Sequence, residues 1–146
     1  MAKHSLQIAK ISYNSAAKLV EAVFRDAQKH GWSIAAAVLD PSGHVVASGR
    51  MDGALAPILD FAIDKAYTST LGNTSHAFAE RMNSSVGLAM GAANRPRLCA
   101  WDGGVPIYEG SALIGALGVS GATGQEDIQT AEAAVAEVGL STIFGQ

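Results

Sequence analysis

The segment Gly118-Val119-Ser120-Gly121-Ala122-Thr123-Gly124 carries the strongest chemical signal in the sequence. It leaves a predicted strand and enters a predicted helix, whose start is marked by Thr123 and Glu126 at the spacing of a capping box. Backbone N–H groups at a helix N-terminus attract carboxylates and phosphates, and glycines let a ligand come close to the backbone. We therefore expect an anion site at the amides from Gly121 to Gln125. The alternative is a glycine-rich turn that only permits tight packing of strand and helix.

Charged side chains that could complete this site come from two other segments. Arg50 and Asp52 lie at the end of a predicted hairpin, and Asp64 and Lys65 lie on a predicted helix. Asp60 is four residues before Asp64, so the two carboxylates are neighbours on one helical face, and partial burial would raise the pKa of one of them. Such a carboxyl could serve as a general acid or base, while Lys65 or Arg50 holds an anionic substrate. The alternative is a solvated helix face with a local salt bridge.

The histidines are spread along the chain at positions 4, 30, 44 and 76. None has a partner at the spacing of a zinc site, so we expect no metal site of that kind. His76 is predicted at the start of a short helix beside a loop-rich region, from which its side chain could reach a pocket. The alternative is a solvated surface histidine. Cys99 falls in a predicted strand, where a buried and unreactive thiol is the usual outcome.

Composition narrows the class of protein. With 146 residues, the chain is expected to form one domain over residues 1–146. The net charge is −3 without a basic stripe, which argues against a nucleic-acid partner, and the longest apolar run, Ile34 to Leu39, is too short to cross a membrane. An N-terminus without an apolar signal region and the lone Cys99 predict a cytoplasmic protein. Only 16% of the residues are charged, so we expect a homo-oligomer that covers part of its apolar surface.

Periodicity and turn residues predict the elements that position these side chains. Helices are expected from about Ala16 to His30, capped by Ser12 or Asn14 and ended by Gly31, from Pro57 to about Leu71, over His76–Met82, and after Thr123 through Val138. Strands are expected at Ser33–Asp40, His44–Met51, Leu98–Trp101, Val105–Glu109 and Ala112–Ser120, and Asn83–Pro96 is expected to be a loop with at most one helical turn. The order α-β-β-α-α-β-β-β-α predicts an α+β fold, with an antiparallel sheet flanked by helices. In the last strand, Ala112, Ile114, Ala116 and Gly118 are expected to form a smaller surface that a helix or ligand could approach closely.

Five segments in this order resemble the GlcG/HbpS family, and together they cover nearly the whole chain. They are Ala37–Asp40 with Gly43-His44, Arg50–Ala54, Asp60–Thr68, Gly103–Pro106, and Gly115–Gly121 with Gln125 and Asp127. The resemblance implies a profilin-like fold and symmetric oligomers. Some members bind haem, some form the C-terminal domain of PduO-type corrinoid adenosyltransferases, and many are encoded in operons for the catabolism of small organic acids or aromatic compounds. His76 falls where some relatives carry a histidine.

Two functions fit these observations. The first is a binding protein for haem or a small catabolite. Its predicted ligand-binding residues are Arg50, Asp52, Lys65, Gly104, Pro106, Gly121, Thr123 and Gln125. For haem we expect at most weak binding, with His76 as the iron ligand. The second is a cofactor-independent isomerase, tautomerase or lyase acting on a small carboxylated intermediate, with Asp64 or Lys65 as the acid or base. We rank binding first, because the sequence shows no recognisable catalytic set.

Overall fold

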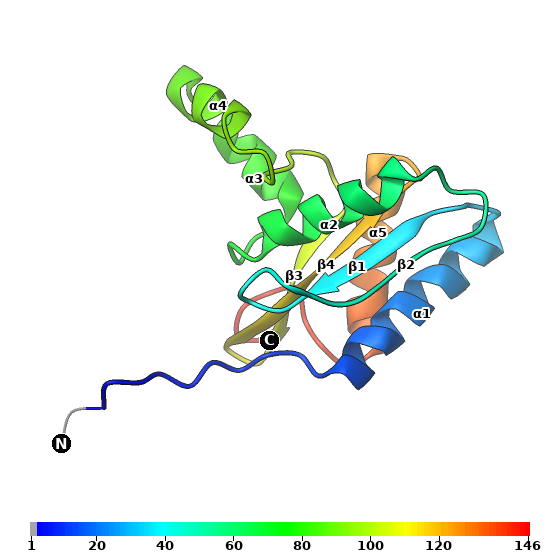
Figure 1. The fold of residues 1–146 in the computed structure, drawn as a ribbon, viewed down its shortest axis with the longest axis horizontal. Helices are drawn as coiled ribbons and strands as arrows, with labels where there is room; N and C mark the ends of the chain where they lie inside the picture. The colour runs from blue at the N-terminus through cyan, green and yellow to red at the C-terminus, as the bar shows by residue number, and fades with distance from the viewer. Residues whose placement is uncertain (1–2) are drawn as a thin grey trace.

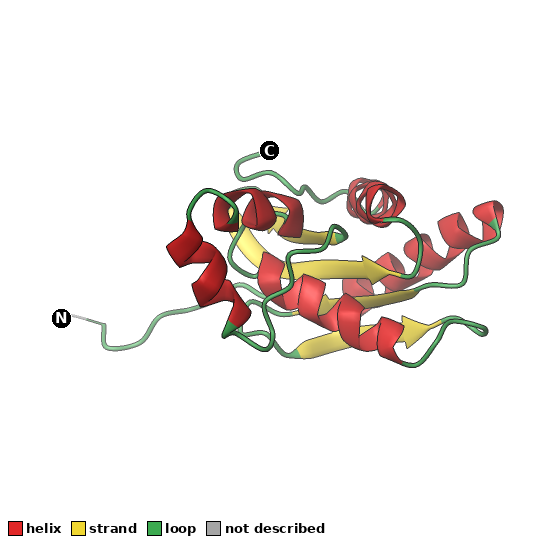
Figure 2. Ribbon diagram, turned by 90° about the horizontal axis from the view of Figure 1, so that it is seen from above, coloured by secondary structure: helices red, strands yellow, loops and turns green. Residues whose placement is uncertain are grey.

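A computed structural model describes residues 3–146, and among these residues the chain forms five helices and one four-stranded antiparallel sheet. The elements are α1 (Tyr13–His30), β1 (Ala35–Leu39), β2 (Val45–Arg50), α2 (Pro57–Ser69), α3 (Ser75–Met82), α4 (Val86–Ala93), β3 (Gly104–Glu109), β4 (Ala112–Ser120) and α5 (Gly124–Glu137). The strand order is β2-β1-β4-β3. Figures 1 and 2 show α2 on one face of the sheet and α1 and α5 on the other. The predicted α+β class and antiparallel sheet are confirmed.

The face covered by α1 and α5 holds the larger core. Helix α1 begins where Ser12 accepts a hydrogen bond from the N–H of Ser15 at 3.2 Å and ends at Gly31, which has a φ of 73°. Both ends were predicted, because a serine cap and a left-handed glycine are common helix boundaries. Leu19 and Val23 on α1 pack in one cluster with Leu117 of β4 and with residues of α5. This layer supplies most of the buried apolar surface.

On the other face, α2 lies unusually close to the sheet. The strand residues beneath it are small, namely Ala35, Ala37, Ala116 and Gly118. A Cβ atom at Gly118 would overlap the carbonyl oxygen of Ala62, and one at Gly104 would overlap the carbonyl oxygen of Lys65. The predicted close approach is therefore confirmed at Ala116 and Gly118, whereas the prediction is wrong for Ala112 and Ile114, which a β-bulge places with the opposite core. Because α2 packs so closely on the sheet, its side chains that face the sheet, such as Lys65, lie next to the end of β4.

Two local expectations between α3 and β3 are wrong. The segment Leu98–Trp101 is not a strand: the N–H of Cys99 donates to Oγ1 of Thr68 on α2 at 2.8 Å, and the outer edge of β3 pairs instead with Ser141 through Tyr108. The expected loop Asn83–Pro96 contains α4, which is two turns long. The hydroxyl of Ser85 caps α4 by accepting from the N–H of Leu88 at 3.2 Å.

Helices α3 and α4 form an arm that projects away from the sheet (Figure 1). No residue of α4 is buried, although the helix carries no charged side chain. Val86 and Met90 are 75% and 65% exposed. Within residues 3–146, none of the helices has both the length and the hydrophobicity that crossing a membrane requires.

Candidate functional site

An open hollow of about 300 Å³ lies where α2, the loop before β3 and the turn between β4 and α5 meet. It is lined by Ile58, Phe61, Lys65, Trp101, Asp102, Ser120, Gly121, Ala122, Gly124 and Asp127. Other surface hollows have similar volumes, but this one brings together the predicted residues Lys65 and Gly121. Polar groups lie on its floor and aromatic side chains at its rim. We therefore take it as the candidate site.

Lys65 and Asp127 form a buried ion pair at the floor of the hollow. The Nζ atom of Lys65 lies 3.0 Å from Oδ2 of Asp127 and donates to the carbonyl oxygen of Val119 at 2.9 Å. The side chains are only 4% and 3% exposed. Burial raises the pKa of the Asp127 carboxyl, and the nearby Lys65 charge and backbone N–H groups oppose part of that rise. The other oxygen of Asp127 accepts from the N–H of Ala122 at 3.1 Å. The chain's own carboxylate thus occupies part of the predicted anion site.

The start of α5 has the predicted capping box. The N–H of Glu126 donates to Oγ1 of Thr123 at 3.3 Å, and the N–H of Thr123 donates to Oε2 of Glu126 at 2.9 Å. The carboxylate of Glu126 accepts hydrogen bonds from the N–H and from the hydroxyl of Thr123, and these two bonds lower the pKa of the Glu126 carboxyl. The N–H groups of Gly124 and Gln125, the first two residues of α5, have no intrahelical acceptor. Both residues are exposed, and of the two only Gly124 lines the hollow.

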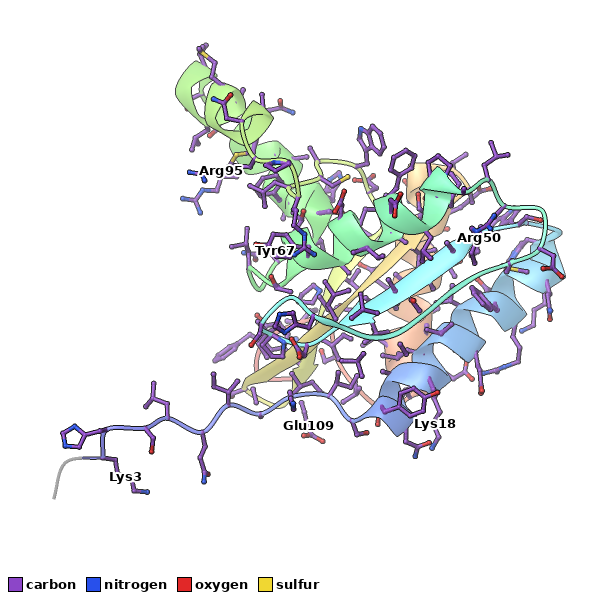
Figure 3. The ribbon with its side chains drawn as sticks, in the orientation of Figure 1. Lys3, Lys18, Arg50, Tyr67, Arg95 and Glu109 are labelled. Atoms are coloured by element: carbon purple, nitrogen blue, oxygen red, sulfur yellow. The ribbon has the colours of Figure 1, made fainter. Side chains whose placement is uncertain are left out.

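The other predicted ligand-binding residues lie outside the lining of this hollow. Arg50 is at the same end of the sheet, because Ala35 pairs with both Arg50 and Ser120. Two strand spacings, about 10 Å, therefore separate the backbones of Arg50 and Ser120. The guanidinium of Arg50 donates to the carbonyl oxygen of Ala54 (Figure 3 shows its position near the start of α2). Asp52 is exposed in the turn that follows β2.

Gly104 and Pro106 are buried within β3, so they support the packing of α2. Thr123 is exposed beside the hollow, where it caps α5. The structure therefore brings Lys65 and Gly121 together, places Thr123 and Gln125 at the adjoining helix start, and leaves the remaining predicted residues apart from the hollow.

The two candidates for acid–base chemistry differ in their surroundings. Partial burial raises the pKa of the Asp64 carboxyl, Asp60 adds to the rise, and Arg97 opposes it. This agrees with the expectation that one carboxyl of the pair has a raised pKa, although burial is the larger cause. Asp64, however, does not line the hollow, whereas Lys65 does and its Nζ donates to two acceptors. A catalytic acid or base needs both a suitably shifted pKa and access to the ligand. Asp64 has the shifted pKa and Lys65 lines the hollow, so neither residue combines the two properties.

His76 lies at the edge of the site, in the first turn of α3. Its Nδ1 atom is 2.9 Å from Oδ1 of Asp102, which lines the hollow, and its Nε2 atom is 3.6 Å from Oε1 of Glu80. The side chain is half exposed, and the hydrogen bond to Asp102 raises the pKa of the imidazole above its ordinary 6.5. Next to Asp102, Trp101 packs edge-to-face on Phe61, with their ring centroids 5.2 Å apart.

Five residues that line the hollow had no predicted role, namely Phe61, Trp101, Asp102, Ser120 and Asp127. One local signal pointed to Asp127, because an acidic residue in the first turn of a capped helix is close to the free N–H groups. The other four come from three separate segments, and only the folded chain brings them together.

Comparisons with known proteins give a consistent result. A model of the family described as "Haem degrading protein HbpS-like" matches residues 11–136. Protein GlcG of Escherichia coli K12 is 39% identical over 111 residues, which are 75% of this chain and 81% of GlcG. A double mutant of HbpS from Streptomyces reticuli has a similar structure, with a TM-score of 0.84 and 27% identity over 94% of this chain and 92% of HbpS. A structure described as a PduOC:heme complex has a TM-score of 0.84 at 22% identity over 92% of this chain and 99% of that chain, which shows a shared fold.

Proposed function

This chain belongs to the HbpS-like family, and from that premise we propose that it binds a small molecule, with haem as a ligand held by His76. One observation carries the haem assignment: the 2.9 Å contact between Nδ1 of His76 and Oδ1 of Asp102. A carboxylate accepts the Nδ1–H, so the lone pair of the imidazole is left on Nε2, as in most metal-binding histidines. Support comes from the family description and from the haem complex of the PduOC protein, which has the same fold.

The surroundings of His76 fit a haem that stays partly exposed. Trp101 is 59% exposed and packs on Phe61, so both offer an apolar surface to one face of a porphyrin. A porphyrin is too large for a hollow of 300 Å³ to enclose. Glu80 must turn away from Nε2 before iron can bind there. Bound haem would supply an iron centre for ligand binding or redox chemistry. These features support the expectation of weak binding.

A haem titration compares the His76→Ala variant with a matched histidine control. We expect His76→Ala to weaken haem binding by at least about tenfold and to change the Soret band, because the variant lacks the side chain that would hold the iron. His44→Ala removes another exposed histidine, in the turn between β1 and β2, and should leave the haem affinity and the Soret band unchanged. A Soret band and affinity that are the same in His76→Ala and wild type would remove His76 from the site.

The pH dependence of haem binding tests the role of Asp102. A protonated imidazole cannot bind iron, and Asp102 raises the pKa of His76, so haem affinity should fall as the pH drops through a midpoint above 6.5. In Asp102→Asn the negative partner is lost and the midpoint should move to lower pH. A midpoint that stays in place or rises in Asp102→Asn would contradict the proposed orientation of His76.

We also propose that the protein is a homo-oligomer in which α4 lies against a second copy. A helix with no buried and no charged residue is costly to expose, and a partner subunit would cover Val86 and Met90. Light scattering is expected to give a multiple of the 15.0 kDa chain mass, and Met90→Glu should lower that mass. A wild-type mass of one chain at micromolar concentration would contradict the proposal.

A further inference from the structure

We propose that the hollow is a binding site for a small carboxylate with a flat apolar body, held by Ser120, Lys65 and the N–H of Gly124. This ligand is distinct from haem, and its site does not require His76. The inference therefore goes beyond the proposed haem binding and can fail without it. It rests on hydrogen-bond donors that the fold leaves unused at one wall of the hollow.

Ser120 is the first of these donors. It is the last residue of β4 and lies on the side of the sheet that faces α2, as Gly118 does. Ser120 is only 4% exposed and lines the hollow, and within residues 3–146 its hydroxyl makes no hydrogen bond to another protein group. Polar groups buried to this extent normally have a partner in the protein, in water or in a ligand. The hydroxyl of Ser120 is therefore available to water or to a ligand in the hollow.

Lys65 provides the second donor. Its Nζ atom uses one N–H for Asp127 and one for the carbonyl oxygen of Val119, so one of the three N–H groups of the ammonium is left, and Lys65 lines the hollow. Gly124 adds a backbone N–H at the positive end of α5. Three donors at one wall match the acceptor oxygens of a carboxylate.

Two carboxylates of the protein also line the hollow, and each has a partner. Asp127 accepts from Lys65 and from the N–H of Ala122, and Asp102 accepts from His76. Their charges are thus partly balanced before a ligand enters. Because Asp127 already pairs with Lys65, the ligand is held by directed hydrogen bonds more than by net charge, and we expect moderate affinity.

The rim of the hollow determines the shape of the ligand. Phe61 and Trp101 stand edge-to-face, and Ile58 lies on the same helix as Phe61. Aromatic walls of this kind favour a flat, apolar body, and an open volume of 300 Å³ limits the ligand to a small molecule. Benzoate has this combination of a carboxylate and a flat ring, so it is a suitable probe.

The test is a titration of the full-length protein with benzoate, followed by the backbone amide signals in ¹H–¹⁵N NMR spectra. We expect benzoate to shift the signals of Gly121 and Gly124, and the neutral analogue benzamide to bind at least about tenfold more weakly, because the charged acceptor is lost. Ser120→Ala should weaken benzoate binding by about tenfold. Ser111→Ala, an exposed serine in the turn between β3 and β4, is the matched control and should have no effect.

Other variants separate this site from the haem site and from loss of folding. Trp101→Ala changes an exposed side chain and should weaken benzoate binding but not the binding of acetate, which has no ring. His76→Ala should weaken haem binding far more than benzoate binding, because it removes the partner of Asp102 but leaves all three donors in place. The proposal is overturned if benzamide binds as well as benzoate, if a folded Ser120→Ala binds benzoate as tightly as wild type does, or if the shifted signals lie away from the hollow.

Discussion

Replacing Gly118 with alanine should cost more than about 3 kcal/mol in the free energy of unfolding. Gly118 lies in β4 directly under α2, where a methyl group would overlap the carbonyl oxygen of Ala62 and lie 2.7 Å from the backbone nitrogen of Ala66. Both are backbone atoms of a helix, so neither can rotate away as the end of a side chain could. The whole of α2 would have to move outward, and the packing around Lys65 would change with it. Urea denaturation of the variant and the wild type measures the loss.

The same substitution at Gly87 is a matched control. A Cβ atom at this position of α4 would meet nothing within 4 Å, and the residue is helical. Alanine favours a helix over glycine by about 1 kcal/mol, so Gly87→Ala should leave stability unchanged or raise it. If Gly118→Ala were as stable as Gly87→Ala, α2 would be free to move and the close packing would have little importance.

Beneath α2, residue size and alternation made the packing predictable. Ala116 and Gly118 share one face of β4, and small side chains at alternate positions predict a close neighbour. The alternation does not extend along the whole strand, because Tyr108 pairs with Leu113 and Ile107 pairs with Gly115. This leaves Ile114 without a partner in a β-bulge, so Ile114 packs in the core of the opposite face. A bulge depends on the partner strand, and the local pattern of β4 does not reveal it.

The two incorrect predictions between α3 and β3 have the same kind of cause. Leu98–Trp101 has the composition of a short strand, but its place in a sheet depends on whether a strand edge is free beside it. That edge of β3 is taken by Ser141. In α4, Gly87 and Gly91 weaken the helical signal, and an apolar helix without a polar face has no clear periodicity. The contact with α2 fixes the conformation of Leu98–Trp101, and the cap at Ser85 marks the start of α4.

The candidate site shows the same limit of local sequence information. The sequence predicted a ligand site at the glycines after β4, a capping box at the start of α5, and a position for Lys65 opposite them. The partner of Lys65 was not, because Asp127 is 62 residues away along the chain. An i, i+4 spacing can be recognised in a sequence, whereas a pair between two helices depends on how the sheet places them. For this reason the expected open anion site proved to contain a carboxylate of the protein itself.

Removing Asp127 should be among the most damaging changes to this protein. Asp127→Ala leaves the Lys65 ammonium buried without its counter-ion, and breaking a buried pair in this way typically costs about 3–5 kcal/mol. Lys65→Met has a similar cost, because it leaves the carboxylate unpaired. The double variant Lys65→Met with Asp127→Leu should lose much less than the sum of the single losses, since neither charge is left alone. Additive losses in chemical denaturation would mean that the two groups do not depend on each other.

Added formate provides a second test of the same pair. In Asp127→Ala, the space of the lost carboxylate is bordered by the Lys65 ammonium and the N–H of Ala122, which together suit a small anion. Formate that binds the folded variant must stabilise it by linkage, so its unfolding midpoint should rise with formate concentration. Sodium chloride at equal ionic strength is the control for screening. The wild type should gain less than the variant, because its own carboxylate fills this space and formate can bind only at the neighbouring donors of the hollow. Equal gains in wild type and variant would show that formate acts elsewhere, and that Asp127 is not the anion that this helix start was built to hold.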